Sequence, residues 1–248
     1  MKNNIILQHW NGDLPRWAQL AERTVRDYAD DIGVEYELVR GHPLGEAMGP
    51  NPQKLCYLQE KYDKYEYTVM IDMDMIATKQ RYNVFDIPQI GVLHDRAMRD
   101  DGSSMTPSAA PELYKKGEYI FFGNFIKLHR DQRIALREYF DVDYIAPRIQ
   151  NKYAGDETVL HYLIHKSGIL KNKAIEEVCM RCSGTSYKDI YYRENDRFDR
   201  KFANDPVAPN AFVDRSDKDA VFLHFGQAKK KNIENVVREM YGELYASI

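Results

Sequence analysis

The first forty residues alternate between short apolar runs and an apolar stripe at helical spacing. The run Ile5–Trp10 predicts a strand, and Pro15 behind it suits the first turn of a helix, with Asp13 as a candidate cap. Apolar side chains then recur at helical spacing until Gly33, and residues 34–39 alternate as a strand does. The order strand, helix, strand favours a parallel sheet with a right-handed crossover.

The next segment leads to a strand that is apolar on both faces. Residues 41–52 are rich in glycine and proline and predict a loop, and a second helix is expected over residues 53–64. Residues 67–71 then form an apolar run without alternation, which is typical of a strand in the middle of a sheet. We therefore expect this strand to end at a sheet edge, next to whatever residues follow it.

The second half of the chain predicts further elements of both kinds. Strands are expected within 86–94, 119–128 and 221–226, and helices over 131–140, over 155–168 and from Ile233 through Leu244. Residues 95–117 predict a long polar loop, and residues 175–219 predict nothing beyond short strands. Alternating strands and helices place the chain in the α/β class.

Composition excludes several classes of protein. The apolar fraction of 44% and the 14 glycines are ordinary for a globular chain of 248 residues, which excludes disordered and collagen-like classes. A net charge of −3 gives no global reason to bind nucleic acid. No run reaches the roughly 18 apolar residues that a membrane span needs. Three cysteines, an odd number, favour a reducing compartment, so we expect a cytoplasmic protein.

Two acidic residues directly follow the apolar strand at 67–71. Asp72 and Asp74, with Met73 between them, would emerge together at the carboxyl edge of the sheet, where open α/β sheets bind ligands. Close carboxylates repel each other, and a divalent cation is the simplest way to keep both ionised. The alternative is an incidental acidic turn, because this short pattern is common.

A histidine lies near the end of the last predicted strand. His224 is followed by Gly226, which permits close backbone approach, and by the run Lys229–Lys231. This combination suits a metal-bound diphosphate, with the imidazole as a metal ligand and the ammonium groups on phosphate oxygens. The alternative is a packed imidazole followed by a solvated basic helix start.

The order of these motifs resembles that of glycosyltransferases with the GT-A fold, nearest their glycogenin-like and bacterial galactosyltransferase-like branch. In that family a strand-terminal D-x-D and a C-terminal histidine hold Mn²⁺ or Mg²⁺ on the donor diphosphate. The resemblance covers most of the chain and implies a Rossmann-like mixed central sheet flanked by helices. It also implies one domain over 1–248, with a nucleotide-binding half at 1–80 and an acceptor half at 81–248. The branch signature H-x-x-G-x-x-K-P is altered here, since glycine follows His224 by two residues and Lys231 replaces the proline.

The resemblance also implies a set of ligand-binding residues. The metal ligands would be Asp72, Asp74 and His224. The donor-binding residues would be Gln8, His9, Trp10, Lys54, Asp72, Met73, Gly123, Asn124, Gly226, Lys229 and Lys230. Trp10 would stack on a uracil and Lys54 would lie near the donor; the alternatives are a core tryptophan and an exposed helix lysine.

The sequence Gly155-Asp156-Glu157 resembles the family's G-D-Q-D start of a helix, where an acid binds sugar hydroxyls. In an inverting enzyme, Asp156 or Glu157 would be the catalytic base for the acceptor hydroxyl. A retaining enzyme needs no such base, and the glycogenin-like resemblance favours retention. The alternative is an ordinary helix start, because acidic residues there complement the helix dipole.

The expected activity is transfer of a hexosyl or pentosyl group from a nucleotide diphosphate, UDP-linked by preference, to a hydroxyl of a saccharide or other glycoconjugate. One alternative is a phosphatase or phosphotransferase of the haloacid dehalogenase type. Its usual pattern is D-x-D-x-[TV], whereas the fifth position here is Ile76. A second alternative is a glycosyltransferase-like domain that only binds sugar or a partner, which the intact acidic pair and His224 argue against.

Overall fold

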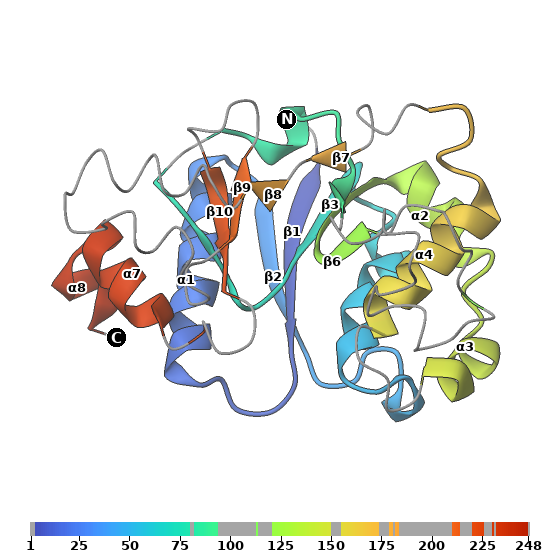
Figure 1. The fold of residues 1–248 in the computed structure, drawn as a ribbon, viewed down its shortest axis with the longest axis horizontal. Helices are drawn as coiled ribbons and strands as arrows, with labels where there is room; N and C mark the ends of the chain where they lie inside the picture. Colours follow the sequence, from blue (N-terminus) through green and yellow to red (C-terminus); the bar gives the residue numbers. More distant parts are fainter. Residues whose placement is uncertain are drawn as a thin grey trace. The chain divides into compact units, whose positions relative to one another are not determined.

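The computed structural model describes residues 3–79, 82–93, 113, 121–149, 155–173, 179–180, 182–183, 210–213, 220–225, 230 and 232–247. The chain forms two compact units, each made of three separate stretches of sequence (Figure 1). The first unit contains Met1–Gly12, Glu37–Ile71 and Pro88–Cys179. The second unit contains Asp13–Tyr36, Asp72–Ile87 and Met180–Ile248. The single-domain organisation expected from the sequence stays a prediction.

The first unit is built on a six-stranded mixed sheet with the strand order β2-β1-β3-β6-β5-β7. Strand β1 pairs in parallel with β3, and β6 runs antiparallel to both β3 and β5. The strands are β1 (Asn4–Trp10), β2 (Glu35–Arg40), β3 (Tyr67–Ile71), β5 (Gly91–Leu93), β6 (Phe121–His129) and β7 (Cys179–Met180). Parallel pairing of β1 with β3 beside antiparallel pairing of β3 with β6 makes the sheet mixed, as predicted.

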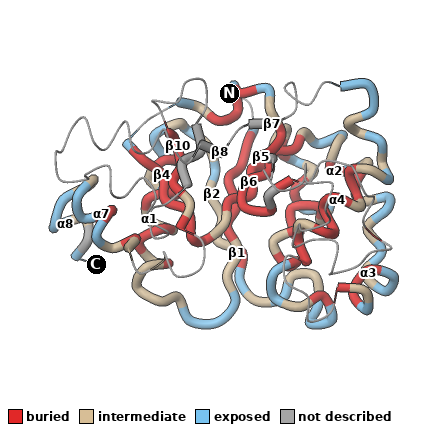
Figure 2. The backbone as a smooth tube through the Cα atoms, in the orientation of Figure 1, coloured by how far each residue is buried: buried red, intermediate tan, exposed pale blue. Residues whose placement is uncertain are grey.

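Helices α2 (Arg130–Arg137), α3 (Val142–Ile149) and α4 (Gly155–Ser167) complete the first unit, with α2 and α4 packed against β6. Strands β1 and β6 and helix α4 are buried along most of their length (Figure 2). Buried Arg133 of α2 ties these layers together, because its guanidinium donates to the carbonyls of Leu128, Tyr62 and Tyr65 at 2.8–2.9 Å.

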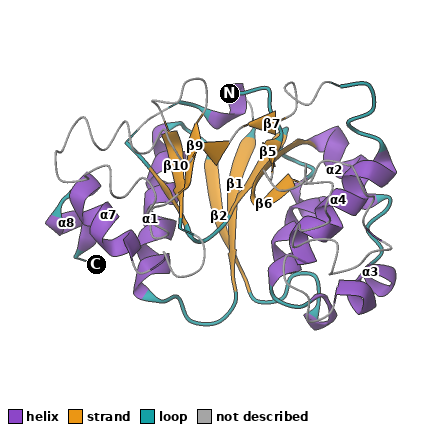
Figure 3. Cartoon of the chain, in the orientation of Figure 1, coloured by secondary structure: helices purple, strands orange, loops and turns teal. Residues whose placement is uncertain are grey.

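The second unit combines helices with an antiparallel sheet of strand order β4-β10-β9-β8 (Figure 3). Its elements are α1 (Arg16–Asp31), β4 (Met75–Ala77), β8 (Cys182–Ser183), β9 (Asn210–Val213), β10 (Ala220–His224), α7 (Ile233–Tyr241) and α8 (Glu243–Ala246). Leu20 and Ala21 of α1 share one core with Ile76, Leu223 and apolar residues of α7. Helix α1 also holds β4 by a hydrogen bond, since the Ala77 N–H donates to Thr24 Oγ1 at 3.1 Å.

The predicted strands at 5–10, 34–39, 67–71, 119–128 and 221–226 and the helices near 17–32, 131–140 and 155–168 are present, with small shifts at their ends. The helix expected over 53–64 is wrong in type. Two short 3₁₀ helices, η2 (Asn51–Leu58) and η3 (Glu60–Tyr62), replace it, because Gln59 between them is extended (φ −67°, ψ 146°). The Gln59 side chain donates to the carbonyl of Pro43 at 2.8 Å, which fixes this break.

Two helix ends also differ from expectation. Helix α1 has Pro15 as its N-cap, with no side-chain cap, so the cap expected from Asp13 is wrong. The C-terminal helix does not run through Leu244, because Gly242 (φ 91°) ends α7 and α8 begins after it. Leu244 is 92% exposed, so it lies outside the apolar face of the C-terminal segment. Helix α3, which contains Pro147, and the short strand β4 had no clear sequence signal.

Candidate functional site

The first candidate cluster lies in the second unit and is set up by backbone hydrogen bonds. The Met75 N–H donates to the Asp72 carbonyl at 3.1 Å, which closes a tight turn leading into β4. Strand β10 pairs with β4 so that His224 lies opposite Met75. The Phe225 N–H then donates to the Asp74 carbonyl at 2.8 Å. The end of β10 is thereby fixed beside the acidic turn.

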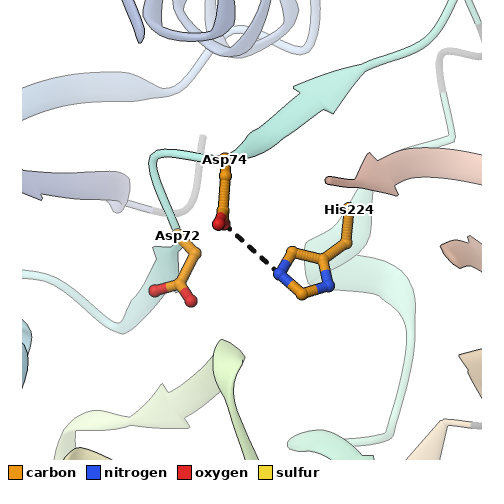
Figure 4. Close-up of side chains that lie close together, drawn as sticks. All are labelled: Asp72, Asp74 and His224. Carbon is orange, nitrogen blue, oxygen red and sulfur yellow. Dashed lines mark ion pairs between the residues drawn. The ribbon is translucent and has the colours of Figure 1, made fainter. Parts of the chain in front are cut away.

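This arrangement brings the three predicted metal ligands together. One potential ligand atom from each of Asp72, Asp74 and His224 lies within 4.8 Å of the others. The carboxylate of Asp74 points toward the imidazole, with His224 Nε2 3.3 Å from Asp74 Oδ1, and Asp72 lies on the same turn (Figure 4). Met73 between them is buried. Along the turn, a buried apolar side chain therefore alternates with two acidic side chains that belong to the cluster.

Asp74 is the electrostatic centre of this cluster. Its side chain is only 12% exposed, and Lys230 Nζ lies 3.1 Å from Oδ2, on the side of the carboxylate not facing His224. Burial alone would raise the pKa of Asp74. The neighbouring imidazole of His224, together with the ammonium of Lys230, outweighs burial and lowers that pKa to about 2. Asp74 is therefore an anion at any physiological pH.

The residues present fit a divalent cation. Asp74 Oδ1 is buried and accepts no hydrogen bond, although a buried carboxylate oxygen normally has a donor or a metal on it. Two carboxylates and one imidazole form a mixed oxygen and nitrogen donor set. Carboxylates suit Mg²⁺ and Mn²⁺, and imidazole is a frequent ligand of transition metals, so the donor set is compatible with a divalent cation.

A second cluster lies in the first unit and joins four of the other predicted site residues. Lys54, on η2, forms an ion pair with Asp156 at the start of α4, with 2.8 Å between Nζ and Oδ2. The two side chains are 15% and 7% exposed. The Gly123 N–H in β6 donates to Glu157 Oε1 at 3.3 Å. Elements η2, β6 and the N-terminus of α4 therefore meet at one polar point.

Residue 123 must be a glycine because no room is left for a Cβ atom. A Cβ atom on residue 123 would lie 1.8 Å from Asp156 Oδ2 and 3.2 Å from Glu157 Cγ. Only a residue without a side chain lets the carboxylate of Asp156 approach the strand and still reach Lys54. The sequence offered one sign of this approach, because a glycine inside a strand often marks a close neighbour. It offered no sign that Lys54 and Asp156 are partners.

The predicted nucleobase residues lie at the end of β1. Gln8 is fully buried, and Trp10 is half-buried. His9 Nε2 lies 2.7 Å from the Gly41 carbonyl, and burial lowers the pKa of His9 against the opposing effect of that hydrogen bond. His9 is thus a neutral histidine that donates to the backbone and fixes the loop after β2.

The remaining predicted residues are placed only in part. Asn124 is buried in β6, and Lys230 lies beside Asp74 as described above. Gly226 and Lys229 lie outside the described residues, as do the loop at 95–117 apart from Leu113 and most of 175–219. Within the described ranges, no helix has the length and apolar composition that crossing a bilayer requires.

Comparison with known proteins finds similar proteins by structure alone. No family model and no curated protein matches the sequence. The apo-form glycosyltransferase GlyE of Streptococcus pneumoniae matches with a TM-score of 0.50 at 11% identity, over 100% of this chain and 62% of that one. The galactosyltransferase LgtC, solved with donor and acceptor sugar analogues, matches with a TM-score of 0.49 at 12% identity, over 96% of both chains.

A glycosyltransferase involved in glycosylation of the major capsid of PBCV-1 matches with a TM-score of 0.49 at 12% identity, over 94% of this chain and 99% of that one. At such identities the likeness to GlyE concerns the fold. The expected fold class, a GT-A-like mixed α/β architecture, is confirmed.

Proposed function

We propose that this protein is a metal-dependent glycosyltransferase that takes a sugar from a nucleotide diphosphate donor, UDP-linked by preference, and attaches it to a hydroxyl of a saccharide or other glycoconjugate. The observation that supports this most is the convergence of Asp72, Asp74 and His224 on one point, with a buried oxygen of Asp74 that accepts no hydrogen bond. A fold shared with solved glycosyltransferases gives this cation site its context.

In the proposed reaction the three ligands would hold Mn²⁺ or Mg²⁺, and a cation bound there would stabilise the negative charge that develops on the departing nucleotide diphosphate. The chain's own part is to prepare the site. The turn at 72–75 and the pairing of β4 with β10 fix the ligands before any donor arrives. Asp74 stays ionised because its pKa is about 2. No proton therefore has to leave this carboxylate when a cation binds.

We assign Asp156 and Glu157 to the sugar rather than to the diphosphate. Both side chains are held in place, Asp156 by the ammonium of Lys54 and Glu157 by the N–H of Gly123. Fixed carboxylates suit the recognition of sugar hydroxyls, because each can accept charge-assisted hydrogen bonds. A retaining transfer needs no general base from them. An inverting transfer would use one of the two to accept the proton of the acceptor hydroxyl.

The test is a thermal-shift experiment with Mn²⁺, UDP and both together. Mn²⁺ alone should raise the melting temperature slightly, and Mn²⁺ with UDP should raise it by roughly 5–10 °C at a hundredfold excess over Kd. The Asp74→Asn variant should lose the metal-dependent part and keep its fold. No shift with UDP and metal would refute the donor site. Rapid phosphate release from a generic phosphomonoester would instead favour the phosphatase alternative.

A further inference from the structure

We infer that Lys230 is a built-in counter-ion of the metal site, which opposes binding of a bare divalent cation and favours binding of the cation together with a diphosphate. The inference rests on the proposed function, because it concerns the same site. It adds a role for Lys230 that the three ligands do not supply: Lys230 weakens binding of the cation alone and strengthens binding of the cation together with the diphosphate. The residues involved, Asp74, His224, Lys230 and Trp17, all belong to the second unit.

The geometry shows both oxygens of Asp74 facing positive or protonatable groups. Lys230 Nζ lies 3.1 Å from Oδ2, and His224 Nε2 lies 3.3 Å from Oδ1. The Lys230 ammonium also lies 5.0 Å from the centre of the Trp17 ring, so an aromatic face supports it from a second direction. Without a metal ion, Asp74 is thus neutralised by the protein itself.

A cation that binds Asp74 must therefore approach an ammonium group already on the same carboxylate. Two cations on one carboxylate repel each other, and the repulsion is stronger at a site where Asp74 is mostly shielded from water. Lys230 should for this reason weaken the affinity for Mn²⁺ alone.

A diphosphate changes the sign of this effect. Its negative charges attract the same ammonium, so Lys230 strengthens binding once metal and nucleotide are present together. The Lys230 side chain is 35% exposed, and its long flexible stem allows the ammonium to turn from Asp74 to an incoming phosphate. Since binding free energies are linked reciprocally, UDP should raise metal affinity by the same factor by which metal raises UDP affinity.

The experiment compares wild type with Lys230→Met, which keeps the stem and removes the charge. Mn²⁺ binding without nucleotide is titrated by the electron paramagnetic resonance signal of free Mn²⁺, and UDP binding is then titrated by calorimetry at saturating Mn²⁺. We expect Lys230→Met to bind Mn²⁺ alone on the order of tenfold more tightly than wild type, and UDP in the presence of Mn²⁺ on the order of tenfold more weakly. Lys230→Arg keeps the charge and should behave like wild type in the first titration.

A matched control is available in the same unit. Lys79 also places its ammonium over an aromatic ring, 5.9 Å from the centre of Tyr241, and it is exposed. Lys79→Met should leave both affinities unchanged. Melting temperatures of all variants without metal show whether each is folded.

The outcomes separate this inference from the proposed function. If wild type binds Mn²⁺ with UDP but Lys230→Met has the same affinity as wild type for Mn²⁺ alone, the counter-ion role is wrong and the metal site stands. If Lys230→Met weakens both titrations, Lys230 only supports the site and the inference is overturned. If wild type binds no Mn²⁺ even with UDP, the metal site is refuted, and the inference with it.

Discussion

Substituting Gly123 by alanine tests the closest contact in the second cluster. The added Cβ would lie 1.8 Å from Asp156 Oδ2, whereas Cβ atoms essentially never come closer than 3.0 Å to another heavy atom. The oxygen must therefore retreat by about 1.2 Å or the strand must shift. Because Oδ2 is also the atom that Lys54 Nζ contacts at 2.8 Å, the retreat breaks this ion pair.

The magnitude follows from two opposing contributions. Loss of a mostly buried, charge-assisted hydrogen bond costs about 1.5–3 kcal/mol. Replacing glycine within a strand by alanine returns about 0.5–1 kcal/mol, because alanine loses less backbone entropy on folding. Gly123→Ala should therefore lower the free energy of unfolding by about 1–2 kcal/mol, or the melting temperature by about 2–8 °C for a chain of this size.

Urea unfolding followed by circular dichroism measures this change, and a second background makes the cause specific. In an Asp156→Ala protein the clashing oxygen is absent, so adding Gly123→Ala should cost close to nothing. The two substitutions would then be strongly non-additive, as expected for residues in direct contact. Equal costs of Gly123→Ala in both backgrounds would refute the close approach of β6 and α4.

Two further predictions concern buried charges. The pKa of Asp74 is lowered from its ordinary value of 3.8 to about 2 in the folded protein. Ionised Asp74 therefore stabilises the fold by about 2 kcal/mol at pH values above 3.8, and this stabilisation is lost as the pH falls through 2. In urea unfolding without metal, Asp74→Asn should be about 2 kcal/mol less stable than wild type at pH 6 but only about 1 kcal/mol less stable at pH 3. If this difference in the free energy of unfolding does not shrink at low pH, the ion contacts of Asp74 are contradicted. Arg133→Met should lower the free energy of unfolding by about 3 kcal/mol, because three carbonyls lose a charged donor. The same change at exposed Arg130 should lower it by under about 0.5 kcal/mol. Equal losses at the two positions would show that the buried guanidinium does not join the layers.

The metal triad could be predicted from the sequence because each half of it has a strong local signal. A continuous apolar run before Asp72 and another before His224 predicted two buried strands, and polar residues directly after such strands lie at a sheet edge. The sequence did not show how the ends of these two strands come together. The short strand β4 pairs His224 with Met75 and so supplies the register, and three residues are too few for a periodic pattern.

The second cluster was predicted only as separate residues. Lys54 and Asp156 are far apart in the sequence, and ion pairing between distant positions leaves no periodic trace. The local pattern around Lys54 even suggested the wrong helix type, because apolar residues at helical spacing also suit two successive 3₁₀ helices separated by the extended Gln59. Local propensity limits which elements can form, and long-range contacts of this kind then determine which residues meet.

The C-terminal segment shows a second limit of sequence patterns, namely in locating the end of a helix. Apolar spacing continues through Leu244, but Gly242 takes a positive φ and ends α7 first. Periodicity alone cannot give the position at which a glycine stops a helix, although a glycine near the end of a helical pattern is a recognised stop signal.

Metal-dependent hydrolysis of nucleotide sugars tests the proposed glycosyltransferase activity most directly. Wild type is incubated with a panel of UDP-, GDP-, ADP- and CDP-linked sugars, with Mn²⁺ or with a chelator, and release of the free sugar and nucleotide is followed. We predict that at least one UDP-sugar is cleaved with Mn²⁺, that the chelator stops the reaction, and that Asp74→Asn and His224→Ala abolish it. Cleavage that survives the chelator and both substitutions would contradict the metal site, and cleavage of none of the donors, alone or with added saccharide acceptors, would contradict the proposed transferase.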